Sequence, residues 1–415
     1  MAFPFNPRTV AHQTHLQRNN QISLKNPATI MNPNISKLYL IGALFETHFF
    51  IAIIVPFLKT LGFTMTEIFL LEAAFALTIV MLEIPTGYFA DIYERKTSLI
   101  ISGLFGFIGI SIFCLSTTFA GFLLGEILIA VSTSFASGAV EAFFYDTLLE
   151  TNEEHKYKKV QGNAFLYQRI GGIIATVLGG VLATIFLRLP FYLSVIPPFV
   201  GMILIFTLRE PHRHKIQHEH WNHFVKILKE SFCNLRLRWF IIFAAFPRAF
   251  FLLGFWLYQA YMSFVQLPIF YFGIIVAGMG ITSGLSSKFA TEIEKLLTPK
   301  FSLITVPLVA SISWLIMANV NSMWGIIFVF LASAMWGFFM PVCNDFIQKI
   351  VSSDRRATVL SIMNLMPRLM FFAFSPILGR ITDLYNVQTA LLASAIMLPV
   401  LVAPFIFLLK PLLRH

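Results

Sequence analysis

Charged residues are scarce in this chain. Only 12% of its 415 residues are Asp, Glu, Lys or Arg, whereas 57% are hydrophobic. Soluble domains carry about 25% charged residues, so these charges are too few to cover a surface that faces water. No polar stretch is long enough to form a soluble domain by itself. We therefore expect the lipid bilayer to be the solvent for most of the chain.

Cysteine is also scarce. Cys114 and Cys343 lie in apolar runs, Cys233 lies in a polar linker, and none shows metal-ligand spacing. We therefore expect neither a disulfide nor a metal site. No nucleophile has a matching base, so we predict no enzymatic activity and no cofactor. Five linker histidines are interpreted as a solvated segment rather than a metal site: His212, His214, His218, His220 and His223.

The charges that are present are mostly positive, giving a formal net charge of +10. On a soluble protein this excess would suggest a nucleic-acid partner. Here the basic residues lie in short segments between apolar runs, so we expect contact with membrane lipids and none with nucleic acid. Residues 1–36 are polar and contain no apolar core of a secretory signal. We interpret them as a disordered cytoplasmic tail, with a transit peptide as the weaker alternative.

Twelve apolar segments are long enough to cross the hydrocarbon core, which takes about 20 helical residues. They form two groups of six, separated by a polar linker at 209–237. This pattern predicts an all-α polytopic membrane protein with two pseudo-symmetric six-helix bundles, at residues 37–208 and 238–415. The predicted spans are 38–58, 66–88, 97–117, 121–146, 161–186, 190–208, 239–263, 267–287, 301–319, 323–346, 358–380 and 388–409.

The distribution of Lys and Arg predicts the orientation. With the N-terminus inside, 24 of the 30 Lys and Arg residues fall in inside segments and 3 fall in outside loops. Basic residues mark cytoplasmic loops. We therefore expect both termini on the cytoplasmic side of a bacterial inner membrane.

The two groups of spans also repeat each other. Asp146 precedes Arg169 by 23 residues, and Asp345 precedes Arg368 by the same 23. A shift of 199 residues relates these pairs and also superposes small residues around them. Parallel six-helix repeats are typical of carriers that bind substrate between the repeats near the middle of the membrane.

Residues 83–96 read EIPTGYFADIYERK. This segment resembles the signature between helices 2 and 3 of the major facilitator superfamily, in the form Glu-x-Pro-x-Gly-x-x-x-Asp found in a bacterial subgroup. Its positions are filled by Glu83, Pro85, Gly87, Asp91, Arg95 and Lys96. The resemblance implies a transporter whose helices 1, 4, 7 and 10 line a cavity. It also implies that Asp91 engages the start of helix 11 and holds an inner gate closed.

Other residues are predicted to belong to gates or match the signature only in part. Asp146 and Asp345 fall at inner helix ends and are predicted to belong to gates. In the second half Lys288 stands where the signature would place Asp. The segment GRITD at 379–383 has the same Gly-x-x-x-Asp spacing, but the predicted topology places it outside, so we interpret that spacing as a coincidence.

Three arginines lie deep within predicted spans. Arginine stays charged, so each one needs an anionic partner. Glu141 is a candidate partner for Arg169. Arg248 and Arg368 have no carboxylate at equal depth in the adjacent helix, which favours contact with substrate.

Several acidic or neutral titratable groups are candidates for carrying protons or contacting substrate. Glu46 and His48 lie in the middle of predicted helix 1, and each can gain and lose a proton. Glu46 could equally pair with Arg248. Glu141 is a second candidate for proton coupling. Glu126 is a third, although it is interpreted alternatively as a residue at the outer rim of helix 4.

These features predict a monomeric secondary active transporter that moves a small-molecule substrate by alternating access. The deep arginines favour an anionic or zwitterionic solute, such as a carboxylate-rich metabolite or a siderophore-like metallophore, with proton symport as a hypothesis. One alternative is a multidrug/proton antiporter. The resemblance disfavours this alternative. Proton-driven exporters of the superfamily often carry an Arg in helix 4, where this chain has Glu126, and a Gly-Pro motif in helix 5, which here lacks the proline. The other alternative is a receptor or sensor on the same fold.

Overall fold

The computed structural model describes residues 32–212, 234–351 and 353–409. The tail before residue 32, Cys233 and the histidines beyond His212 lie outside these residues. The described residues form helices joined by turns, without strands, and eleven helical segments are long and apolar enough to cross a membrane. The predicted all-α membrane fold is therefore confirmed, and eleven of the twelve predicted spans correspond to such segments.

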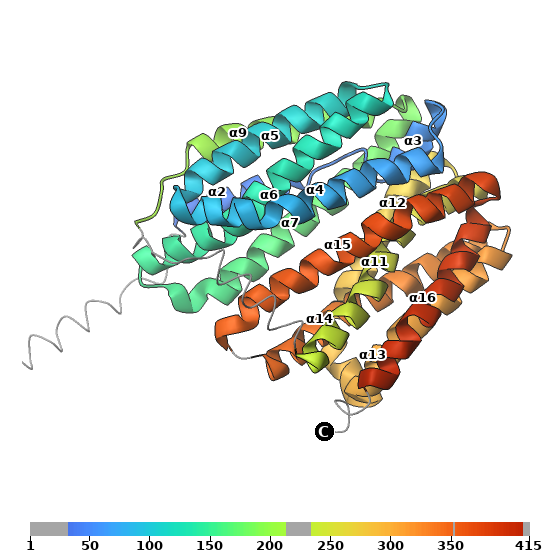
Figure 1. The fold of residues 1–415 in the computed structure, drawn as a ribbon. Coiled ribbons are helices and arrows are strands. Elements are labelled where there is room, and N and C mark those ends of the chain that lie inside the picture. The colour runs from blue at the N-terminus through green and yellow to red at the C-terminus, as the bar shows by residue number, and fades with distance from the viewer. Residues whose placement is uncertain (1–31, 213–233, 352, 410–415) are drawn as a thin grey trace, which may run out of the picture.

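The helices follow one another with short connections (Figure 1). The first half comprises α2–α9 and the second half α11–α16. Their bounds are α2 Pro33–Phe45, α3 Ile54–Thr60, α4 Met65–Ile92, α5 Arg95–Leu115, α6 Phe119–Glu150, α7 Tyr157–Ile185, α8 Leu189–Leu193, α9 Ile196–Phe206, α11 Leu235–Phe264, α12 Ile269–Lys288, α13 Ala290–Asn319, α14 Ile327–Ile350, α15 Ser353–Leu384 and α16 Val387–Leu409.

The connecting turns lie at two ends of the bundle, which we name after residues in them. The Gly62 end holds the turn between α3 and α4, where Gly62 adopts φ 89°. The Asn152 end holds the turn after α6, where Asn152 adopts φ 54°. Polar residues in the turns start the next helix. Thr118, for example, accepts a hydrogen bond from Gly121 N at 3.3 Å and caps α6.

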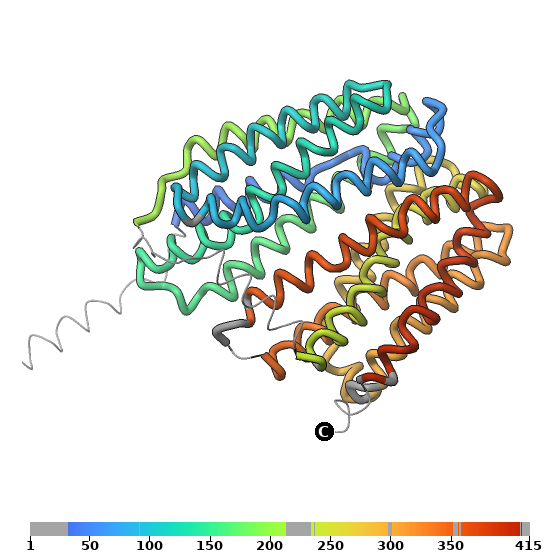
Figure 2. The backbone as a smooth tube through the Cα atoms, viewed as in Figure 1, coloured from blue at the N-terminus to red at the C-terminus, as the bar shows by residue number. Residues whose placement is uncertain are grey.

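Among the described residues, the two halves share a core at one end only. One buried apolar cluster joins side chains of the first half near the Gly62 end, such as Phe57 and Phe69, to side chains of the second half, such as Phe250 and Leu378. A separate cluster contains first-half residues alone, including Leu38, and lies toward the Asn152 end. The halves are therefore packed together at the Gly62 end, and the backbone traces diverge toward the Asn152 end (Figure 2).

Two helix pairs carry most of this packing between halves, α4 with α15 and α7 with α12. The second pair depends on two glycines in close approach. A Cβ on Gly273 would lie 2.1 Å from Thr176 O, and one on Gly180 would lie 2.7 Å from Phe270 O. Helices in lipid associate through small residues because these let the backbones meet. Any larger side chain at either glycine would force α7 and α12 apart.

Candidate functional site

The predicted first span is not a continuous helix. α2 ends at Phe45 and α3 begins at Ile54, so residues 46–53 form turns in the middle of the span. Glu46 and His48 therefore lie in irregular backbone, and the prediction of a continuous helix 1 is wrong. Non-helical backbone at membrane depth is tolerated only where protein or water satisfies its polar groups.

Neighbouring helices hold this break in place. Phe49 N donates to Ser194 Oγ at 2.9 Å, and Ser194 lies at the turn between α8 and α9. On the other side α7 comes so close that a Cβ on Gly179 would lie 1.8 Å from Phe49 O. A side chain at Gly179 would therefore displace the break.

A residue of the second half completes the support. Gln259 of α11 donates from Nε2 to Ile51 O at 3.0 Å and accepts at Oε1 from Val55 N at 3.2 Å. Its side chain is only 1% exposed. One amide thus replaces two backbone partners that a continuous helix would supply. It also links α11 to the first span across the boundary between the halves.

Glu46 and His48 occupy different surroundings in the break. Glu46 is exposed and interacts electrostatically with Arg169 of α7. Arg169 is also exposed, with its guanidinium 4.7 Å from the ring centre of Phe165. The His48 ring packs against Phe50, and its Nδ1 is buried without a hydrogen-bond partner. The predicted pair between Arg169 and Glu141 is absent among the described ion pairs within 4 Å, and the interaction of Arg169 with Glu46 is electrostatic, without such an ion pair.

Arg248 is positioned by a proline in another helix. Pro367 has no backbone N–H, so the carbonyl of Met363, four residues earlier in α15, loses its helical donor. Arg248 Nη1 donates to Met363 O at 2.5 Å, and Nη2 donates to Asn364 Oδ1 at 2.8 Å. Arg248 is 8% exposed, and its Nε has no hydrogen-bond partner. The guanidinium is therefore a buried cation held by neutral oxygens.

Arg368 faces a carboxylate from the other half. It interacts electrostatically with Glu83 of α4, and it also lies near enough to Arg248 for the two cations to repel each other. Glu83 also lies near Ser137 of α6 and feels the charge of Glu141. The sequence predicted no partner for Arg368, because no carboxylate lies at equal depth in the adjacent helix of its own half.

The Glu126 side chain is buried rather than at the rim. It is 7% exposed and interacts electrostatically with Glu72 of α4. Two carboxyl groups therefore lie close together between α4 and α6. The interpretation of Glu126 as a rim residue is wrong. Sequence alone gave no sign of the pairing, because Glu72 and Glu126 belong to different spans.

Comparison with known proteins identifies the family. The chain matches the sequence profile described as Major Facilitator Superfamily over residues 38–375. It belongs to the major facilitator superfamily. The resemblance stated from the signature is thus confirmed at the level of the family. The bacterial subgroup remains a prediction.

Individual relatives in the superfamily are distant. The chain is 29% identical over 186 residues to multidrug resistance protein 1 of Bacillus subtilis, and this match covers 43% of the chain and 46% of the relative. It is 28% identical over 204 residues to multidrug resistance protein 2 of the same organism, covering 47% and 50%. The chain thus spans about half the length of the curated relatives it matches.

Solved structures extend the likeness in fold over nearly the whole chain. The nucleoside transporter NupG superposes with a TM-score of 0.75 at 17% identity, covering 91% of this chain and 99% of that one. A bacterial homologue of the human lysosomal transporter Spinster, inward-facing and unoccupied, gives 0.75 at 17%, covering 91% and 98%. At these identities the likeness shows the fold alone.

The superfamily signature can now be placed in the structure. Its segment ends α4 and starts α5 at the Asn152 end. Arg95 Nε lies 3.6 Å from Asp146 Oδ2, and Arg95 Nη1 donates to Ala90 O at 2.7 Å. A Cβ on Gly87 would meet nothing within 4 Å. The side chain of Asp91 lies outside the described part of the structure, so its predicted contact with helix 11 remains a prediction.

Two further residues complete this region. Glu210 accepts hydrogen bonds from Arg95 N at 2.8 Å and Lys96 N at 2.7 Å. Glu210 therefore caps the start of α5, a role that a residue directly before the helix usually fills. Glu210 was not predicted from the sequence, because it lies 114 residues along the chain from Lys96. Asp345 pairs with Lys349 on its own helix, at 2.5 Å.

Proposed function

We propose that this member of the superfamily is an alternating-access secondary transporter of a small anionic or zwitterionic solute. The observation that carries this proposal is the buried guanidinium of Arg248, which is held by two neutral oxygens and lies beside a second cation, Arg368. A buried charge is costly unless it is paired. A carboxylate or phosphate of the solute would supply the missing charge, and guanidinium groups bind both in a bidentate manner.

The broken first span supports a binding site at the same level of the membrane. Discontinuous helices present free backbone groups where carriers bind their substrates and coupling ions. Glu46 and His48 lie at this break, and Glu46 with Arg169 supplies an exposed pair of opposite charges. We infer that Glu46, His48, Arg169, Arg248 and Arg368 contact the solute.

The proposed orientation places the Asn152 end in the cytoplasm of a bacterial cell. The Lys and Arg residues concentrate on that side, as the positive-inside rule requires. The described parts of the two halves share no core there, so this conformation would be open to the cytoplasm. Arg95, Asp146 and Asp345 would then belong to the cytoplasmic gate region.

Proton coupling is part of the proposal. Glu46 and Glu141 are exposed within spans, and Glu126 shares a buried site with Glu72. Two carboxyl groups held close together cannot both ionise without repelling each other, so one of them can hold a proton. The test is transport in proteoliposomes with and without an imposed pH gradient. Uptake that does not respond to the gradient would contradict coupling to protons.

A binding screen followed by substitution tests the solute class. Purified protein would be screened by thermal shift against carboxylates, amino acids, siderophores and cationic drugs. For the stabilising compound we expect Arg368→Gln and Arg248→Gln each to weaken binding about tenfold or more, since a hydrogen bond to a charged group contributes roughly 1.5–3 kcal/mol. Lys158→Gln is the matched control, because Lys158 is exposed beyond the site. Unchanged affinity in both arginine variants would remove them from the site.

Export of amphipathic drugs is the second candidate function. It is favoured by the likeness to the two proteins of Bacillus subtilis named for multidrug resistance. Export of a cationic dye, with no stabilisation by any anion, would support this candidate over the first. Binding without flux in liposomes would instead indicate a receptor on a transporter fold.

A further inference from the structure

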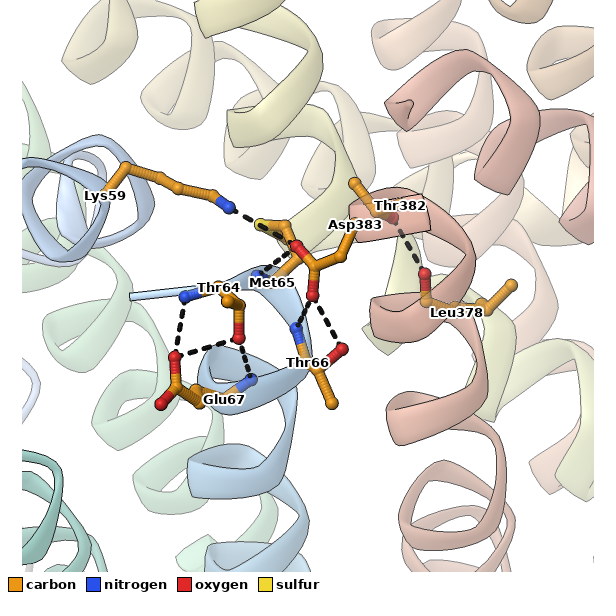
Figure 3. Close-up of polar contacts among 8 residues, drawn as sticks. All are labelled: Lys59, Thr64, Met65, Thr66, Glu67, Leu378, Thr382 and Asp383. Atoms are coloured by element: carbon orange, nitrogen blue, oxygen red, sulfur yellow. Dashed lines mark hydrogen bonds and ion pairs between the residues drawn. The ribbon is translucent and has the colours of Figure 1, made fainter. Parts of the chain in front are cut away.

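A cluster of polar contacts joins the two halves at the Gly62 end, where α15 meets the start of α4. Asp383 Oδ1 accepts a hydrogen bond from Met65 N at 2.7 Å, and Oδ2 accepts from Thr66 N at 2.7 Å and from Thr66 Oγ1 at 2.6 Å (Figure 3). Lys59 Nζ lies 3.6 Å from Oδ1. A carboxylate of the second half thus caps a helix of the first.

These bonds complete the start of α4. The first N–H groups of a helix have no partner within it. Thr64 Oγ1 accepts from Glu67 N at 3.1 Å, which satisfies the third of them. Asp383 satisfies the first two, at Met65 and Thr66. The carboxylate also lies at the positive end of the helix dipole, where negative charge is favoured.

A close approach of the two helix backbones supports the same contact one turn earlier on α15. A Cβ on Gly379 would lie 2.8 Å from Thr66 Cα and 3.0 Å from Met65 O, so only glycine lets α15 come this close. Another turn earlier, Ser375 Oγ donates to Phe69 O at 3.5 Å. Residues 375, 379 and 383 therefore form one stripe along the first turns of α4. The Gly-x-x-x-Asp spacing at 379–383 has a structural cause, and its interpretation as a coincidence is wrong.

We propose that Gly379 and Asp383 form a latch that holds the two halves together at the Gly62 end and that must open for the transporter to expose its site there. The latch is strong in this conformation because one side chain takes three donors and a cation. It is also reversible, because Asp383 is exposed and Thr66 is only half-buried. When the halves part, water can replace each partner. The proposal rests on alternating access but not on the identity of the solute.

Distances between spin labels at the Gly62 end test the latch. Labels would be attached at Thr117→Cys and Tyr385→Cys, two exposed turn positions in opposite halves, after the three native cysteines are replaced. For Asp383→Ala we expect the ratio of parted to closed molecules at this end to rise at least tenfold, equal to about 1.4 kcal/mol. The measurement is made on purified protein without substrate, so an error in the proposed solute class does not affect it.

The matched control is Glu67→Gln. Glu67 lies in the same first turn of α4 but bonds only to Thr64, within the first half. This variant should leave the distance distribution unchanged. Thr66→Val removes one donor from the latch while retaining the backbone bond, so a smaller shift, about threefold, is expected. It provides the test if Asp383→Ala does not fold. The proposal would be overturned if both latch variants showed the wild-type distance distribution. It would also be overturned if Glu67→Gln shifted the distribution as much as the latch variants do.

Discussion

The amide of Gln259 offers the sharpest test of how the broken first span is held. Replacing Gln259 by Met keeps the length of the side chain and removes both polar atoms. Ile51 O and Val55 N then lose the partners that lie 3.0 and 3.2 Å away. Val55 is 1% exposed, so water cannot easily reach its N–H group. The substitution should therefore destabilise the joint between the first span and α11.

The magnitude follows from the two lost bonds. Hydrogen bonds between membrane helices contribute about 0.6 kcal/mol each on average, which sets a lower estimate of about 1 kcal/mol for the pair. Leaving a buried polar group without a partner costs roughly 1–3 kcal/mol, which sets an upper estimate of about 6 kcal/mol for two. Ile51 is only partly buried, so its carbonyl can recover some hydration. We expect a loss of about 2–3 kcal/mol.

The assay is thermal unfolding of the purified protein in detergent. Gln259→Met should lower the unfolding midpoint by several degrees. Ser263→Ala is the control, because the Ser263 hydroxyl donates only to Gln259 O on the same helix, at 3.1 Å. If Gln259→Met is as stable as Ser263→Ala and the wild type, the amide does not support the break.

Two further substitutions test packing and helix ends. Gly273→Ala places a Cβ about 2.1 Å from Thr176 O, so α7 and α12 must separate, and we expect a loss of roughly 1–3 kcal/mol in unfolding measurements. Gly284→Ala, with open space around it, should unfold like the wild type. Arg188→Ala removes a guanidinium that donates to two carbonyls at the end of α5, at 2.8 and 2.6 Å, and should cost about 1 kcal/mol in the same assay. A midpoint equal to that of Lys158→Ala would contradict this role.

The spans were predictable because their signal is local. A run of about 20 apolar residues is sufficient to identify a membrane helix, whatever packs against it. The prediction of a span at 66–88 thus matches α4, Met65–Ile92, within a few residues. The break at 46–53 was not predictable by this route, because most of those residues are apolar too. Its causes lie in other helices, at Ser194, Gly179 and Gln259.

The candidate site was likewise predictable from the sequence only in part. The deep arginines stand out in the sequence because a charge in a span is rare and costly. One partner of Arg248 had a local sign, since Pro367 frees the carbonyl of Met363 within the same helix. The partner of Arg368 had none. Glu83 reaches it from the opposite half, and only the packing of α4 on α15 brings them together.

The packing of α4 on α15 also connects the proposed gates to the proposed site. The helices are antiparallel, since Asp383 near the end of α15 meets Thr66 near the start of α4. This register places Glu83 within about a turn of Arg368 and brings the end of α4, residues 87–91, level with the beginning of α15.

The same Gly-x-x-x-Asp spacing therefore ends both helices, at opposite ends of one pair. In this conformation Gly379 is in tight contact and Gly87 has open space. Under the proposed alternating access, stiff helices that close at the Gly87 end would pivot and release the Gly379 end. Under the proposed function, an anion bound to Arg368 would weaken its attraction to Glu83, which lies between the two ends. The solute would then act directly on the helix pair that carries the latch.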